Sequence, residues 1–142
     1  MSYELREHTA DVAVAAEGGT LGEAFAAVAD GMAAAMADDV PPGGDRFPVS
    51  VAAEGREALL FDYLDELIYE RDVRVVLPVD NEATVSGPDG GTDSDGEWRV
   101  EATARGVALD RVDARDLKAV TYSEMELTET DEGWRAYVVF DV

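Results

Sequence analysis

Two stretches of the chain repeat apolar residues at helical spacing. The first opens with Thr20 and Glu23, which have the residue types and spacing of a helix capping box, and is predicted to end near Asp38. The second is predicted over residues 57–71. The apolar stripes are Leu21, Phe25, Val28, Ala29, Met32 and Met36 in the first helix and Leu60, Leu64, Leu67 and Ile68 in the second.

Most of the remaining chain alternates apolar and polar residues with the period of two that is typical of β-strands. The alternation is cleanest at 98–105, where Trp98 and Val100 fall on one face and Arg99 and Glu101 on the other. Turn-forming residues at 41–44 and a polar loop at 87–96 interrupt the pattern. Strands are predicted at 12–16, 47–53, 73–79, 83–86, 98–105, 119–128 and 134–141.

The order of these elements favours an α+β fold, because both helices come early and hairpin-like links join the later strands. We expect two layers: a mostly antiparallel or mixed sheet of six to seven strands, with the two helices covering one face. The length of 142 residues suits one ordinary domain, so we expect a single domain over residues 1–142.

The charge of the chain is strongly negative: 32 acidic and 11 basic residues give a net charge of -21. Nonspecific nucleic-acid binding needs a basic surface and is therefore excluded, and adsorption to anionic membranes is disfavoured. An apolar fraction of 46% argues against disorder. Acidic, Lys-poor composition is typical of proteins in a salt-rich cytoplasm, so we expect a halophilic protein that needs salt to stay folded.

Nucleophilic catalysis has little support, because the chain has no Cys and only one His. The absence of Cys also excludes disulfides and thiolate metal sites. No apolar run approaches the roughly 18 residues that a membrane span needs. The first residues lack the apolar segment of a secretion signal, so a cytoplasmic location is expected.

Carboxylates near both ends of the chain are candidate metal ligands. Asp141 and the terminal carboxylate of Val142 follow an amphipathic strand, and two adjacent carboxylates attract an oxygen-seeking cation. Asp11, in the segment His8-Thr-Ala-Asp11, offers a third carboxylate. Such a ligand set favours Ca²⁺, Mg²⁺ or Mn²⁺ over Zn²⁺. Taken alone, His8 to Asp11 is better explained as a turn, and a terminal Asp is expected by chance in so acidic a chain.

Lys118 is the only Lys in a chain that otherwise uses Arg. This choice suggests a compact ammonium that neutralises carboxylates or contacts a phosphate, against the alternative of an ordinary exposed side chain. The acidic residues of 89–97 do not match the spacing of an EF-hand loop. The acids of 62–70 are most simply the solvent-facing side of the second helix.

Several short segments, taken in order, resemble the archease family over nearly the whole chain. They are His8-Thr-Ala-Asp11, Gly19-Thr-Leu-Gly-Glu-Ala-Phe25, Leu59-Leu60, Leu64-Asp-Glu-Leu67, Lys118-Ala-Val-Thr-Tyr122 and Asp141-Val142. The resemblance implies a small α/β protein that activates the RtcB-type tRNA-splicing RNA ligase, promoting its guanylylation and multiple turnover, and is not itself a ligase.

The resemblance also implies roles for individual residues. Asp11, Asp141 and Val142 match the positions that bind a divalent cation in the family, with Ca²⁺ the expected ion. Lys118 matches a functional Lys and would act with Asp141 on the partner, and His8 is an accessory candidate. The chain departs from the family pattern at Val107, at 112–113 and at Ser123, where Glu or His is common.

Two other functions stay open at this point. The first is a chaperone-like module that binds unfolded or partly assembled proteins. The second is a simple divalent-cation-binding protein without a partner. An autonomous hydrolase is the least favoured reading, because the chain lacks a nucleophile.

Overall fold

In the part of the chain that the structure describes, seven antiparallel strands form two separate sheets. A computed structural model describes residues 2–7, 11–88 and 97–142 of the chain. In spatial order, the four-stranded sheet contains β1 (Ser2–Glu7), β2 (Asp11–Gly18), β7 (Gly133–Asp141) and β6 (Ala119–Thr130). The three-stranded sheet contains β3 (Arg46–Glu54), β5 (Glu97–Ala108) and β4 (Val76–Ser86). The helices are α1 (Leu21–Met36), α2 (Arg56–Arg74) and the short 3-10 helix η1 (Leu109–Arg111).

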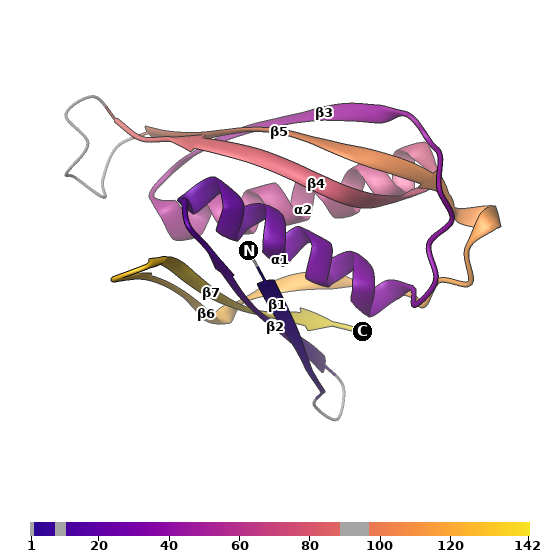
Figure 1. Cartoon of the computed structure of the whole chain (residues 1–142), viewed down its shortest axis with the longest axis horizontal. Coiled ribbons are helices and arrows are strands. Elements are labelled where there is room, and N and C mark those ends of the chain that lie inside the picture. The colour runs from indigo at the N-terminus through magenta and orange to yellow at the C-terminus, as the bar shows by residue number, and fades with distance from the viewer. Residues whose placement is uncertain (1, 8–10, 89–96) are drawn as a thin grey trace.

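The two long helices lie between the two sheets (Figure 1). Each of them contacts strands of both sheets. The predicted α+β class, with two α-helices and a largely antiparallel arrangement of strands, is confirmed. The expected single sheet with helices on one face is replaced by three layers, with a sheet on either side of the helices. One continuous core joins these layers.

The composition of α1 explains this central position. Twelve of its 16 residues are buried, so the helix has no broad polar side to turn toward solvent. Two glycines let its backbone approach both sheets. A methyl group at Gly22 would overlap the carbonyl group of Ala83 in β4, and one at Gly31 would overlap Val14 in β2. An apolar helix of this kind is stable only when it is covered on both sides.

The predicted start of α1 is also confirmed. The backbone N–H of Glu23 donates to Thr20 Oγ1 at 3.1 Å, and the backbone N–H of Thr20 donates to Glu23 Oε1 at 3.2 Å. These reciprocal bonds satisfy two backbone donors that the first helical turn leaves free. The helix therefore starts where the chain turns back from β2 into the core.

Three elements differ clearly from the sequence-based expectation: β1, β4 and the end of α2. β1 was not predicted at all. The expected strands 73–79 and 83–86 are one strand, β4, whose register shifts between Val79 and Glu82, with Asp80 at a φ of 48°. Such a bulge lets a turn-like Asp-Asn pair remain inside a strand. α2 continues through Arg74, so Val73 is helical rather than extended.

Two predicted features fall wholly or largely outside the described residues. These are His8 and the polar loop at 87–96, of which 89–96 are not described. Among the described residues, neither long helix combines the length and the apolar character that crossing a bilayer requires.

A buried polar cluster connects α1 to the bulge of β4. The half-buried carboxylate of Asp30 accepts hydrogen bonds from the backbone N–H of Asn81 at 3.0 Å and from Asn81 Nδ2 at 2.9 Å. Burial raises the pKa of Asp30, although both hydrogen bonds from Asn81 lower it. The charge of nearby Asp80 also raises this pKa, and that of Arg46 lowers it. The net direction of the pKa shift is upward. Folding therefore stabilises the protonated form of this carboxyl group relative to its charged form.

We expect Asp30→Asn to stabilise the fold at neutral pH. Because the folded pKa lies above the unfolded value, the wild type loses stability as pH rises through the folded pKa. Asn still accepts the bonds from Asn81 and carries no charge. Urea unfolding of both proteins in molar KCl, from acidic to neutral pH, measures the difference, which should shrink on acidification. A difference that is constant across this range would contradict the assignment.

Candidate metal and partner site

The predicted site residues come from three strand ends that lie next to one another in the four-stranded sheet. Asp11 begins β2 and is directly opposite Asp141 at the end of β7. On the other side of β7, Ala119 at the start of β6 is also opposite Asp141. The backbone N–H of Lys118 donates to the carbonyl oxygen of Asp141 at 2.8 Å. The fold therefore brings Asp11, Lys118 and Asp141 together at one end of this sheet.

Asp11 and Asp141 project from the same face of the sheet, because directly opposite residues share a face. The next residue of each strand toward its centre, Val12 or Phe140, packs in or against the core on the helix side. The two carboxylates consequently lie on the outer face, with Cβ atoms about 4.5–5.5 Å apart. Asp11 is half-buried and Asp141 is exposed. Two negative charges at this separation repel each other unless a cation lies between them.

The alternating core residues of β7 determine this orientation. Ala136, Val138 and Phe140 are each fully buried against the helices. Asp141 follows Phe140 and must point the other way. A register slip of one residue would place the carboxylate on the core side and expose Phe140. The burial of these three side chains is thus what holds Asp141 opposite Asp11.

The donor set suits a hard divalent cation. The carboxylates of Asp11 and Asp141 would supply up to four oxygen ligands, and Val142, which is 44% exposed, follows Asp141 directly. Within the described residues there is no group of three or more His, Cys, Asp or Glu side chains that could hold a metal. The two aspartates do not form such a group by themselves, and the cation site with Val142 stays a prediction. His8 lies outside the described residues.

The segment before Lys118 is held by a residue that the sequence interpretation treated only as the end of the second helix. Arg71 Nη1 in α2 donates to the carbonyl oxygen of Leu117 at 2.7 Å. Arg71 is 8% exposed and Leu117 is 1% exposed. One signal was available in the sequence. Arg71 continues the buried stripe of Leu60, Leu64 and Leu67, where a charged residue is unexpected.

β6 bulges shortly after the site. Its register with β7 shifts between Thr121 and Glu126, and Ser123 falls inside this irregular stretch. Tyr122 is 51% exposed. Its ring lies 5.3 Å from that of Phe61 in α2, measured between centroids. The bulge thus presents an aromatic side chain on the surface near Lys118.

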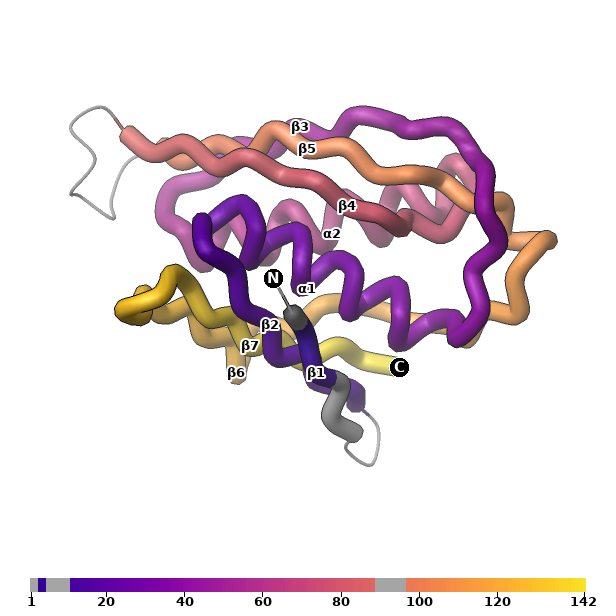
Figure 2. The backbone as a smooth tube through the Cα atoms, viewed as in Figure 1, coloured from indigo at the N-terminus to yellow at the C-terminus, as the bar shows by residue number. Residues whose placement is uncertain are grey.

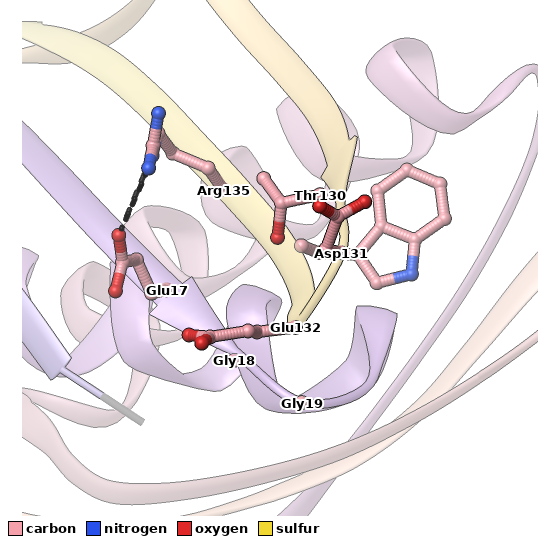
Figure 3. Close-up of a pocket in the computed structure, with 8 residues that line it drawn as sticks. Glu17, Gly18, Gly19, Thr130, Asp131, Glu132 and Arg135 are labelled. Atoms are coloured by element: carbon pink, nitrogen blue, oxygen red, sulfur yellow. Dashed lines mark hydrogen bonds and ion pairs between the residues drawn. The ribbon is translucent and has the colours of Figure 1, made fainter.

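A polar hollow at the opposite end of the same sheet contains none of the predicted site residues (Figure 3). Arg135 Nη2 lies 3.4 Å from Glu17 Oε1 across part of it. Trp134 and Asp141 are seven steps apart along β7, or about 23 Å at roughly 3.3 Å per residue, so the hollow is far from the strand ends described above. Its lining consists of Glu17, Gly18, Gly19, Thr130, Asp131, Glu132, Trp134 and Arg135.

Comparison with known proteins gives one consistent family. Residues 3–142 match the model of the Archease protein family (MTH1598/TM1083). The chain is 34% identical over 144 residues to the protein archease of Methanosarcina barkeri, covering 99% of this chain and 95% of that protein. It is 35% identical over 146 residues to the protein archease of Thermococcus gammatolerans, covering 99% and 98%.

Solved structures agree with this result. The solution structure of protein 1598 from Methanobacterium thermoautotrophicum is similar with a TM-score of 0.76 and 28% identity, covering 99% of this chain and 98% of that one. The crystal structure of an archease from Thermotoga maritima, described as a possible chaperone, shares the fold with a TM-score of 0.62 and 19% identity, covering 98% and 96%. By the match to the family model and the identity to its relatives, the chain belongs to the archease family.

Proposed function

We propose that this chain activates an RtcB-type tRNA-splicing RNA ligase by promoting its guanylylation and multiple turnover. Membership of the archease family supports the link to tRNA processing. The observation that carries the proposal is the meeting of Asp11, Lys118 and Asp141 at one end of the four-stranded sheet. The chain would be a protein cofactor rather than an enzyme, acting in the cytoplasm.

The proposed mechanism uses the strand ends as a tip that approaches the active site of the ligase. The exposed carboxylate of Asp141 would add an oxygen ligand to an incompletely formed metal site in the partner. The ammonium group of Lys118 would balance the acidic tip or contact the phosphates of the nucleotide. A divalent cation held by Asp11, Asp141 and Val142, with Ca²⁺ expected and Mg²⁺ or Mn²⁺ as alternatives, would supply positive charge there.

The net charge of the chain is consistent with a mechanism in which the ligase, and not this chain, binds the RNA. At -21 the chain repels phosphate backbones, so RNA would be the substrate of the ligase and would not bind directly to this chain. A ligation assay with limiting cognate ligase, in molar KCl, tests the proposal. Multiple turnover should appear only when the chain is added. A ligase that turns over equally well without the chain would refute the proposed function.

A chaperone-like role is the main alternative, and the description of the Thermotoga maritima relative as a possible chaperone favours testing it. Light scattering of an unrelated aggregating protein distinguishes the two functions. Broad suppression of aggregation without an effect on the ligase would support the chaperone-like role. A chain that binds a cation but affects neither assay would be a simple cation-binding protein.

We expect titration calorimetry to detect one divalent cation per chain, with Ca²⁺ bound more tightly than Mg²⁺. Ca²⁺ accepts several carboxylates and an irregular geometry, whereas Mg²⁺ requires a near-octahedral site. Asp11→Asn should weaken binding on the order of tenfold or more, because it removes a charged ligand. Asp131→Asn, at the opposite end of the sheet, is the matched control and should bind normally. Equal binding by both variants would exclude Asp11 as a ligand.

A further inference from the structure

The peptide group between Leu117 and Lys118 is held at both of its polar atoms. Its carbonyl oxygen accepts a hydrogen bond from Arg71 Nη1 at 2.7 Å. Its N–H donates to the carbonyl oxygen of Asp141 at 2.8 Å. The first bond comes from α2 and the second from the end of β7. Together they fix the plane of the peptide from which the side chain of Lys118 departs.

Arg71 is an unusual residue for this place. It lies in the last turn of α2 and, within the described part of the chain, it is the only charged residue classed as buried. Its Nε donates to Asp72 Oδ1 at 3.0 Å, and its Nη1 also lies 3.4 Å from Met36 Sδ at the end of α1. Burying a guanidinium group is costly unless its donors are satisfied. An apolar residue would fill the same stripe position without that cost.

The contacts of Arg71 therefore have a structural role besides packing. They join the ends of α1 and α2 to the segment that leads into β6. The same segment is tied to α1 a second time, by the backbone N–H of Arg115 donating to the carbonyl oxygen of Met36 at 2.6 Å. The buried side chain of Leu117 anchors it from the core side. Arg71 is the only one of these groups that bonds directly to the peptide of Lys118 from a helix.

We propose that Arg71 is a positioning residue, which orients Lys118 beside the end of β7 by holding the Leu117–Lys118 peptide. The proposal rests on the proposed function for the roles of Lys118 and Asp141. Because Arg71 is only 8% exposed, we expect it to act through this peptide and not by direct contact with a partner. Its contribution is to fix the backbone from which the side chain of Lys118 departs, next to Asp141, before the ligase is met.

Amide hydrogen exchange tests the positioning without any ligase. Arg71→Met keeps an unbranched side chain but removes the donor, and Arg71→Lys restores a donor. In Arg71→Met the Lys118 amide should exchange about 10- to 100-fold faster relative to the amide of Val138 in the core of β7. Arg71→Lys should recover part of this protection. Equal protection of Lys118 in the wild type and Arg71→Met would overturn the proposal.

The ligation assay tests the consequence. Arg71→Met should lower the maximal turnover at saturating chain on the order of tenfold, with little change in the half-saturating concentration. Partial unfolding alone would raise the half-saturating concentration and leave the maximal turnover unchanged, since adding more chain restores full turnover. Arg74→Met is the matched control, because Arg74 pairs with Glu70 at 3.1 Å on the same helix and should act as the wild type. An unchanged maximal turnover in Arg71→Met would overturn the proposal.

A double substitution separates this proposal from the proposed function. If Arg71 acts through Lys118, Arg71→Met should add little to the loss caused by Lys118→Ala. Additive losses would overturn the positioning role. A wild-type chain that fails to stimulate the ligase would refute the proposed function alone, and the exchange rate of the Lys118 amide would still decide whether Arg71 holds this peptide.

Discussion

Asp141→Asn is expected to reduce stimulation of the ligase on the order of 10- to 100-fold, the range seen when groups around a metal site are lost. The substitution keeps the size of the side chain and removes its charge. The backbone carbonyl that accepts the Lys118 N–H is untouched. Because the side chain is exposed, the free energy of unfolding should change by no more than about 0.5 kcal/mol. Guanylylation of limiting ligase, followed with labelled nucleotide, measures the effect.

Two further variants make this result specific. Lys118→Ala should also lose stimulation, because it removes the only ammonium side chain of the protein. Asp131→Asn makes the same chemical change in the turn between β6 and β7, at the far end of the sheet, and should stimulate as the wild type does. Full stimulation by both Asp141→Asn and Lys118→Ala would refute the proposed mechanism. A loss in Asp131→Asn of equal size would point to net charge instead of position.

Transfer to low salt is expected to unfold the chain. At about 1 M salt charges are screened beyond about 3 Å, whereas at about 0.01 M the screening length is about 30 Å, comparable with the whole molecule. The net charge of -21 then repels across the fold. Exposed ion pairs such as Arg135–Glu17 and Arg99–Glu97 offset little of this repulsion, because each contributes only about 0–1 kcal/mol of stability. Circular dichroism during dialysis from molar KCl measures the transition.

Acidification should partly reverse this unfolding. On the outer face of α2, partial burial and then the charge of Asp65 raise the pKa of Asp62. Partial burial, followed by the charges of Glu70 and Asp65, raises the pKa of Glu66. Raised folded pKa values mean that stability increases as pH falls through them. Sucrose, which does not screen charge, should protect less than salt. A spectrum unchanged by removal of salt would contradict the expected halophilic character.

The local elements were predictable where one physical signal dominates. The Thr20 and Glu23 capping box located the start of α1, and the alternation at 98–105 located the centre of β5. Errors arose where local signals conflict with tertiary contacts. Val73 favours a strand but lies in the last turn of α2. Asp80 and Asn81 have the composition of a turn, yet Asn81 is buried and bonded to Asp30 within β4.

The arrangement of the two sheets around the helices could not be predicted from the pattern of apolar and polar residues alone. Alternation tells which residues of a strand share a face, but not which strand lies beside it. The apolar residues around all sides of α1 were the one indication that the helix is covered twice. The proximity of Asp11, Lys118 and Asp141 was easier to predict, because these residues stand out by type and by the family resemblance, while their roles stay a prediction. The place of Arg71 in the apolar stripe of α2 indicated its burial, but its partner is a backbone carbonyl, which the sequence does not identify.

The strand order of the four-stranded sheet has a consequence for synthesis of the protein. β7 is the last described element, yet it lies between β2 and β6 (Figure 2). Only Asp131 and Glu132 separate β6 from β7, so the two strands leave the ribosome together; until then β2 has an unpaired edge, and such edges recruit other chains. The nine residues of β7 thus close the sheet and bring Asp141 between Asp11 and Ala119 in a single late step. A nascent chain stalled before this point would have the helices and the three-stranded sheet, but only β1 and β2 of the four-stranded sheet and no Asp141.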